Sequence, residues 1–132
     1  MNEEPSNEEP RPLSPEETRR VVELAMGLAR AGDTAELAAF LDHGLPADAQ
    51  DGEGNSLLML AAYHGHAETV RMLVEQGADV DLRNHRDQTP VAGAVFKGED
   101  AVVRVLVEAG ADLDAGTPSA RAAAEMFGRS LD

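Results

Sequence analysis

The sequence contains no cysteine and no tryptophan. Without cysteine, the chain has no disulfides, zinc–thiolate sites or thiol nucleophiles. Aromatic residues make up only 3% of the chain, namely Phe40, Tyr63, Phe96 and Phe127. The other apolar residues are mainly alanine, leucine and valine, which suit thin, closely packed helices better than a thick sandwich or barrel core.

Basic residues are also scarce, with 11 lysines and arginines against 25 acidic residues and a formal net charge of −14. Phosphate groups repel such a surface, so we expect no nucleic acid and no anionic membrane as a ligand. No apolar run approaches the roughly 18 residues that span a bilayer. Residues 1–17 also have neither the basic nor the apolar region of a secretory signal. We therefore expect a soluble, cytoplasmic protein.

The length of 132 residues suits one domain preceded by a short tail. Residues 1–13 are rich in Glu, Pro and Ser, and this composition predicts a disordered acidic tail. Order is expected from Ser14, because Ser14 and Glu17 have the spacing of a capping box and Pro15 suits the first helical position. An apolar face at helical spacing follows, made of Val21, Leu24, Ala25 and Leu28.

Three similar segments begin at intervals of 33 residues, at Gly32, Gly65 and Gly98. The second is "GHAETVRMLVEQGADVDL" and the third is "GEDAVVRVLVEAGADLDA", and ten of their eighteen positions are identical. The first, "GDTAELAAFLDHGLPAD", keeps the apolar positions with fewer identities. The chain is therefore built from a repeated unit.

Each unit combines an extended segment with two helices. In "HAETVRMLVEQG" the apolar residues recur at helical spacing, and Gly77 suits a left-handed helix end. The following "GADVDLRN" is typical of half a short hairpin, and Thr89 with Pro90 then predicts the start of a further helix. One such unit cannot bury its apolar face alone, so neighbouring units must stack.

This pattern resembles the ankyrin repeat, with its T-P-L-H-x-A helix start, G-H turn and G-A-D segment. The resemblance covers about residues 20–129 through "NSLLMLAAYHGHAETVRMLVEQGADVD" and "TPVAGAVFKGED". It implies an all-α fold, an ankyrin-repeat solenoid of stacked helix-turn-helix units joined by short β-hairpin loops. A tetratricopeptide repeat has nearly the same period, but it lacks hairpins and does not place G-A-D between helices.

The resemblance also divides the chain into an N-terminal capping repeat (14–46), two full repeats (47–79 and 80–112) and a shortened C-terminal cap (113–132). The usual histidine of T-P-L-H is absent from both full repeats, which have "SLLM" at 56–59 and "TPVA" at 89–92. Because that histidine would form helix-capping hydrogen bonds, we expect modest local stability.

Four histidines are the residues that most invite a chemical interpretation. His64 and His66 flank Gly65 and could be metal ligands, but no third ligand follows from the spacing. His66 aligns with Asp33 and Glu99, so we expect it to cap the second helix of its unit. His43 and His85 are expected to be surface residues.

The resemblance implies a partner-binding surface on the hairpin tips and first helices. It assigns this surface to Gly52, Glu53, Asn55, Tyr63 and His64 in one unit, and to His85, Arg86, Gln88, Phe96 and Lys97 in the next. Independently, Tyr63 and Phe96 lie one period apart, and aromatic side chains often dominate interface energies. Alternatively, these rings pack between helices. Three basic residues near this side, Arg83, Arg86 and Lys97, would suit an acidic patch on a partner.

No arrangement of serines, histidines and carboxylates suggests catalysis, so we expect a non-enzymatic protein without cofactor or metal. We predict a monomeric protein–protein interaction module, from a bacterium with a GC-rich genome because the chain is rich in Ala, Gly and Arg and has one lysine. An alternative is a regulator, or a protection or assembly factor, of a specific enzyme. Small bacterial proteins that this chain resembles are sometimes linked to oxidative-stress enzymes such as catalase, so the resemblance implies an enzyme of that kind as one example. A metal-dependent enzyme using His64 and His66 is a third reading.

Overall fold

The computed structural model describes residues 11–131, so the predicted tail lies outside the described residues except for its last three positions. The described residues form seven α-helices, and none of these is long and apolar enough to cross a membrane. The helices are α1 (Pro15–Ala31), α2 (Thr34–Asp42), α3 (Leu57–Tyr63), α4 (Ala67–Glu75), α5 (Pro90–Lys97), α6 (Asp100–Glu108) and α7 (Ala120–Met126).

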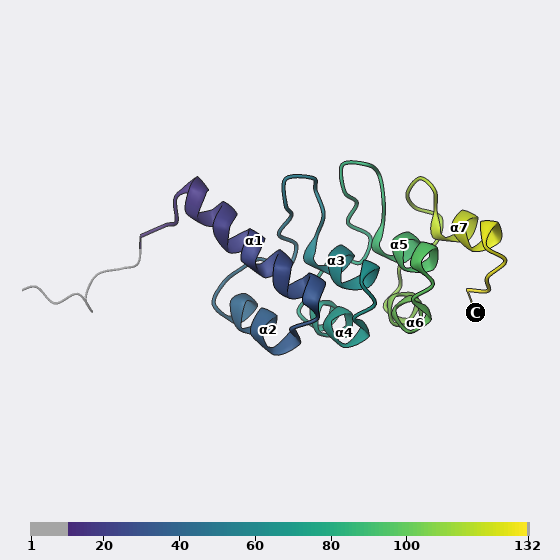
Figure 1. The fold of residues 1–132 in the computed structure, drawn as a ribbon, viewed down its shortest axis with the longest axis horizontal. Coiled ribbons are helices and arrows are strands. Elements are labelled where there is room, and N and C mark those ends of the chain that lie inside the picture. Colours follow the sequence, from purple (N-terminus) through teal and green to yellow (C-terminus); the bar gives the residue numbers. More distant parts are fainter. Residues whose placement is uncertain (1–10, 132) are drawn as a thin grey trace, which may run out of the picture.

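The helices form two rows along one axis (Figure 1). Helices α1, α3, α5 and α7 are neighbours in the first row, and α2, α4 and α6 are neighbours in the second. The loops that connect successive helix pairs project to the same side of the rows (Figure 1), and we call them fingers 1, 2 and 3 (residues 43–56, 76–89 and 109–119). The predicted all-α repeat solenoid is confirmed. The predicted repeat boundaries stay a prediction.

Helices of the two rows differ in the hydrogen bonds at their N-termini. In the first row, the hydroxyl groups of Ser56, Thr89 and Ser119 accept hydrogen bonds from the backbone N–H three residues later, as N-caps do. In the second row, Asp33, His66 and Glu99 occupy the N-cap position without a side-chain capping bond. The prediction that the His66 side chain caps its helix is therefore wrong.

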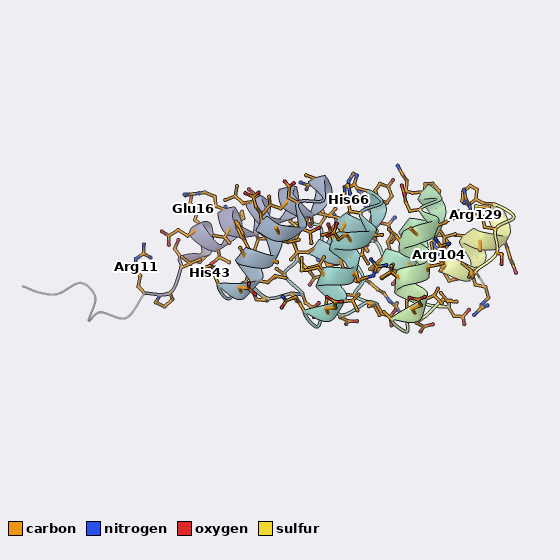
Figure 2. The ribbon with its side chains drawn as sticks, turned by 90° about the horizontal axis from the view of Figure 1, so that it is seen from below. Arg11, Glu16, His43, His66, Arg104 and Arg129 are labelled. Carbon is orange, nitrogen blue, oxygen red and sulfur yellow. The ribbon has the colours of Figure 1, made fainter. Side chains whose placement is uncertain are left out.

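The His66 side chain instead connects two units. Its Nε2 donates a hydrogen bond to the backbone carbonyl of Arg30 in the preceding unit, at 2.7 Å. The ring lies against Gly32, which has φ +76°, and a Cβ built on Gly32 would come within 2.5 Å of His66 Nδ1. One period later, Glu99 lies against Gly65 in the same way. Figure 2 shows the second row, with His66 near the α1–α2 turn.

The core runs along the contacts within and between the rows. Its largest fully buried side chains come from all three complete helix pairs: Met26, Leu37, Leu57, Leu58, Leu73, Val70, Val91, Val95, Val102 and Leu106. The apolar face predicted for α1 is only partly the buried one, because Ala25 is buried while Leu24 is 62% exposed. Helices α2 and α3 pack against the side of α1 that carries Met26 and Ala29.

The fingers are extended but contain no strands within residues 11–131, and finger 1 closes through one isolated antiparallel bridge between Gln50 and Ser56. Aspartate carboxylates bind the exposed backbone instead. The Asp48 carboxylate accepts the Asp79 N–H at 2.8 Å, and one period later the Asp81 carboxylate accepts the Asp112 N–H at 2.8 Å. These bonds tie each finger to the next.

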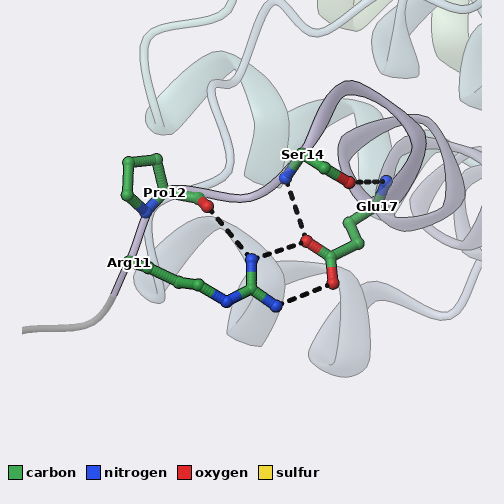
Figure 3. A network of polar contacts seen from close by, with 4 residues as sticks. All are labelled: Arg11, Pro12, Ser14 and Glu17. Carbon is green, nitrogen blue, oxygen red and sulfur yellow. Dashed lines mark hydrogen bonds and ion pairs between the residues drawn. The ribbon is translucent and has the colours of Figure 1, made fainter.

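The start of α1 has the predicted capping box, extended by one arginine (Figure 3). The Glu17 N–H donates to Ser14 Oγ at 3.1 Å, and the Ser14 N–H donates to Glu17 Oε1 at 2.9 Å. Arg11 then binds both Glu17 carboxylate oxygens at 3.0 Å. Together these contacts lower the pKa of Glu17 from 4.5 to about 2, with Arg11 as the largest cause.

We expect NMR titration to give Glu17 a pKa of about 2 and the Arg11→Ala variant to raise it towards 4.5. Because the folded-state pKa lies below the unfolded value, ionised Glu17 stabilises α1 at neutral pH. That contribution declines as the pH falls below 4.5 and is lost as the pH passes through about 2. A Glu17 pKa that does not change in Arg11→Ala would contradict the assignment.

The contact between His66 and Gly32 predicts a coupled pair of substitutions. Gly32→Ala should destabilise the fold by more than the ~1–2 kcal/mol that a left-handed backbone costs a side chain, because the new Cβ also meets His66. Gly77→Ala is the matched control, since Gly77 also has a positive φ but a Cβ there meets no atom within 4 Å.

Urea denaturation measures both free energies of unfolding, and His66→Ala added to Gly32→Ala should remove part of the excess loss. Equal losses in the two alanine variants would show that the His66 ring moves aside without cost.

Candidate functional site

Two aromatic rings stand exposed at the ends of neighbouring first-row helices. Tyr63 on α3 is 39% exposed and Phe96 on α5 is 56% exposed, so neither ring is filler in the core. Each makes an edge contact with one neighbour: Tyr63 with His64 (centroids 5.6 Å apart) and Phe96 with Phe127 (5.5 Å). The rings are therefore held in place while a large part of each surface faces solvent.

An apolar cavity of about 190 Å³ lies between these two rings. Residues from α3, α5 and finger 3 line it, mainly Met59, Tyr63, Ala92, Gly93, Phe96 and Pro118. Gln88 and Thr89 add the polar part of its wall. We call it the aromatic pocket.

A second cavity, of about 290 Å³, adjoins the first on the side of fingers 1 and 2 and shares Met59, Tyr63 and Gln88 with it. Its other lining residues are mostly polar: Glu53, Asn55, Leu60, His64, Asn84 and Arg86. We call it the finger pocket. The two cavities form one groove across the Tyr63 ring, apolar at one end and polar at the other.

Equivalent side chains shape the two finger tips. The Asp51 carboxylate accepts the backbone N–H groups of Glu53 and Asn55, both at 2.9 Å. One period later, the side-chain Oδ1 of Asn84 accepts the backbone N–H groups of Arg86 at 2.9 Å and Gln88 at 3.0 Å. These bonds fix the backbone that carries the predicted contact residues.

Asn84 also joins the two fingers. It is buried, and its amide nitrogen donates to Asn55 Oδ1 at 2.9 Å and to Gln88 Oε1 at 2.7 Å. The backbone N–H of His85 donates to the Glu53 carbonyl at 3.0 Å. The finger pocket is therefore preorganised before any partner arrives.

Charge in the groove differs from charge on the rest of the chain. Lys97 Nζ lies 4.9 Å from the centroid of the Tyr63 ring, a cation–π contact. Arg86 lines the finger pocket, and its guanidinium forms no ion pair with any described residue. Glu53 is the one carboxylate among the described residues lining the two cavities. The groove is thus slightly basic on a protein of net charge −14.

Arg83, predicted to add to this basic group, is instead neutralised by Asp87 at 2.7 Å. Burial lowers the pKa of His64, the nearby His66, Arg30 and Lys97 lower it further, and Glu99 offsets part of this decrease. His64 is therefore neutral at pH 7 and adds no charge to the groove.

The histidines form separate contacts. His64 lies edge-on to Tyr63, whereas His66 binds the Arg30 carbonyl. His43 Nδ1 binds the Ala39 carbonyl at 2.8 Å on the surface. No group of three or more His, Cys, Asp or Glu side chains that could hold a metal ion occurs in the described part of the chain.

Most of the predicted contact residues gather around the groove: seven line its cavities and Lys97 contacts Tyr63. His85 lines neither cavity, since its ring lies against Gly54. Their role in binding stays a prediction. Sequence reasoning missed Asn84 and Gly93. Asn84 could have been found by its alignment with Asp51, and Gly93 as a glycine inside a predicted helix.

Comparisons with known proteins agree with this architecture. A family model for ankyrin repeats in three copies matches residues 25–117. An ankyrin repeat protein of Pseudomonas aeruginosa is 48% identical over 63 residues, which are 48% of this chain and 37% of that protein. Ankyrin repeat domain-containing protein 29 of Homo sapiens is 48% identical over 56 residues, 42% of this chain and 19% of that protein. Oxysterol-binding protein-related protein 1 of Rattus norvegicus is 43% identical over 63 residues, 46% of this chain and 7% of that protein.

The matched segment thus spans little more than a third of these relatives at most. The family model, in contrast, covers more than half of this chain, from the middle of α1 to finger 3. Ankyrin repeats generally mediate protein–protein interactions. By fold, period and family match, this chain is a member of the ankyrin repeat family.

Proposed function

We propose that this protein is a non-catalytic module that binds another protein through the groove between its fingers and first-row helices. The observation that carries the proposal is the pair Tyr63 and Phe96. These rings are exposed, lie one period apart and border the aromatic pocket from both sides.

Their physical setting supports a binding role. Aromatic side chains at the centre of an interface often contribute 2 kcal/mol or more each to binding. The edge contacts with His64 and Phe127 already restrict both rings, so less side-chain entropy is lost on binding. The polar atoms of the finger pocket supply hydrogen bonds beside this apolar centre.

Regulation, protection or assembly of one enzyme, catalase included, would be a more specific form of the same activity and would use the same groove. The acidic surface suits a soluble monomer in the cytoplasm. The identity of the partner decides between a general adaptor and a dedicated enzyme factor.

We expect Tyr63→Ala combined with Phe96→Ala to abolish capture of the partner when the tagged protein is used as bait in a lysate of its source organism. Both side chains are exposed, so circular dichroism should change little. Mass spectrometry of the captured proteins would then identify the partner.

Arg71→Ala combined with Arg104→Ala is the matched control. These arginines also lie one period apart and are exposed, but on second-row helices α4 and α6. This variant should capture the partner as the unaltered protein does. Capture that survives the aromatic substitutions would contradict the proposed interface. Capture that fails only with the arginine substitutions would indicate that the partner binds the second-row helices instead.

The metal-enzyme reading has a separate test. Elemental analysis of the purified protein should find no stoichiometric ion, and added Zn²⁺ should leave the thermal midpoint unchanged within error, because His64 and His66 contact different groups. A bound ion that disappears in His64→Ala combined with His66→Ala would overturn the non-catalytic assignment.

A further inference from the structure

The aromatic pocket has the dimensions of one side chain. Its volume is about 190 Å³, and an apolar cavity of ~150 Å³ holds a benzene molecule in another protein. The Tyr63 and Phe96 rings form two of its walls, and Pro118 of finger 3 and Ala123 of α7 also line it. A single leucine- or phenylalanine-sized group would fill this space.

The pocket is open because two positions in α5 have short side chains. Ala92 occupies the position where the ankyrin pattern has histidine, and Gly93 follows it with no side chain. A Cβ on Gly93 would lie 3.5 Å from Tyr63 Cδ1, in ordinary contact, so alanine is sterically allowed here. A helix with an internal glycine is less stable than the same helix with alanine. Gly93 therefore lowers the stability of α5 at the position where a side chain would narrow the pocket.

The unit before it shows that this register accepts a residue other than glycine. Leu60 lies one period before Gly93 and is buried, and Gly27 lies one period before Leu60. The glycine at position 93 is therefore not required by the fold of the repeat.

The charges beside the pocket favour an anionic neighbour. Lys97 lies over the Tyr63 ring and Arg86 lines the adjoining finger pocket, whereas Glu53 is the single carboxylate there among the described residues. The second-row helices α4 and α6 have a net negative charge, because their exposed carboxylates (Glu68, Glu75, Asp100 and Glu108) outnumber their exposed arginines (Arg71 and Arg104). An acidic segment would be repelled by the net charge of this protein and attracted by the two basic side chains at the groove.

We propose that the aromatic pocket receives one leucine- or phenylalanine-sized side chain from an acidic segment of the partner protein. This inference rests on the proposed function and specifies the chemistry of the partner. The apolar side chain would supply the binding energy and the flanking carboxylates would pair with Lys97 and Arg86.

Three capped pentapeptides test the proposal: acetyl-EDFDE-amide, acetyl-EDADE-amide and acetyl-KKFKK-amide. Each is titrated into the full-length ¹⁵N-labelled protein, and amide shifts are followed by NMR. We expect EDFDE to shift the amides of Gly93 and Phe96, and EDADE to bind roughly tenfold or more weakly because it lacks the apolar anchor. At ~0.5 M salt the advantage of EDFDE over KKFKK should shrink, because ions screen the charges.

The variant Gly93→Leu gives α5 the same residue as Leu60, one period earlier. The new leucine side chain should occupy the aromatic pocket. We expect this variant to lose the EDFDE shifts with a thermal midpoint equal to or above that of the unaltered protein. Gly27→Leu is the control: it makes the same change at the same register in α1, where a Cβ meets no atom within 4 Å. It should bind EDFDE normally.

The outcomes separate the two proposals. Equal binding of EDFDE and EDADE would refute the apolar anchor, and equal or tighter binding of KKFKK in the pocket would refute the acidic segment. If no peptide shifts Gly93 while Tyr63→Ala combined with Phe96→Ala still abolishes partner capture, the groove binds its partner in another way. In that case the proposed function stands and this inference fails.

Discussion

Each helix pair of this chain can bury its apolar face only against the pair beside it. Leu57 and Leu58 of α3 are fully buried, and α3 lies between α1 and α5. In such a stack, stability is approximately the sum of each unit's own stability and of the contacts with its neighbours. The other contacts of the structure therefore have to fit a stack in which the same unit recurs every 33 residues.

The polar contacts of the fingers recur at the same 33-residue spacing as the buried apolar residues. The fingers have almost no sheet among the described residues, so their backbone N–H groups need other acceptors. Asp48 and Asp81 accept N–H groups of the following unit, while Asp79 and Asp112 accept N–H groups within their own finger. Part of the acidic charge of this protein is therefore structural, since these carboxylates replace the hydrogen bonds of a sheet.

The sequence predicted features that depend on one unit and missed those that depend on two. The Thr89 cap followed by Pro90, and the capping box of Ser14 and Glu17, are local and were predicted. The His66 contact with Arg30 was missed, because the destination of that side chain is set by where the preceding unit ends. The residues around the groove were predicted from the family pattern and, for Tyr63 and Phe96, also from their spacing of one period. The part of the groove beside Gly93 depends on the distance between α3 and α5, and the sequence period does not predict that distance.

One consequence follows from the position of the aromatic pocket at the end of the stack. Pro118 of finger 3 and Ala123 of α7 also line it, and α7 packs mainly against α5 among the helices of the described chain. Terminal units of a linear stack have one neighbour and open at a lower free energy than internal ones. A ligand that needs this wall binds only when the last unit is docked. Occupancy of the groove and docking of α7 against α5 are thus thermodynamically linked, so a bound partner would also hold α7 in place.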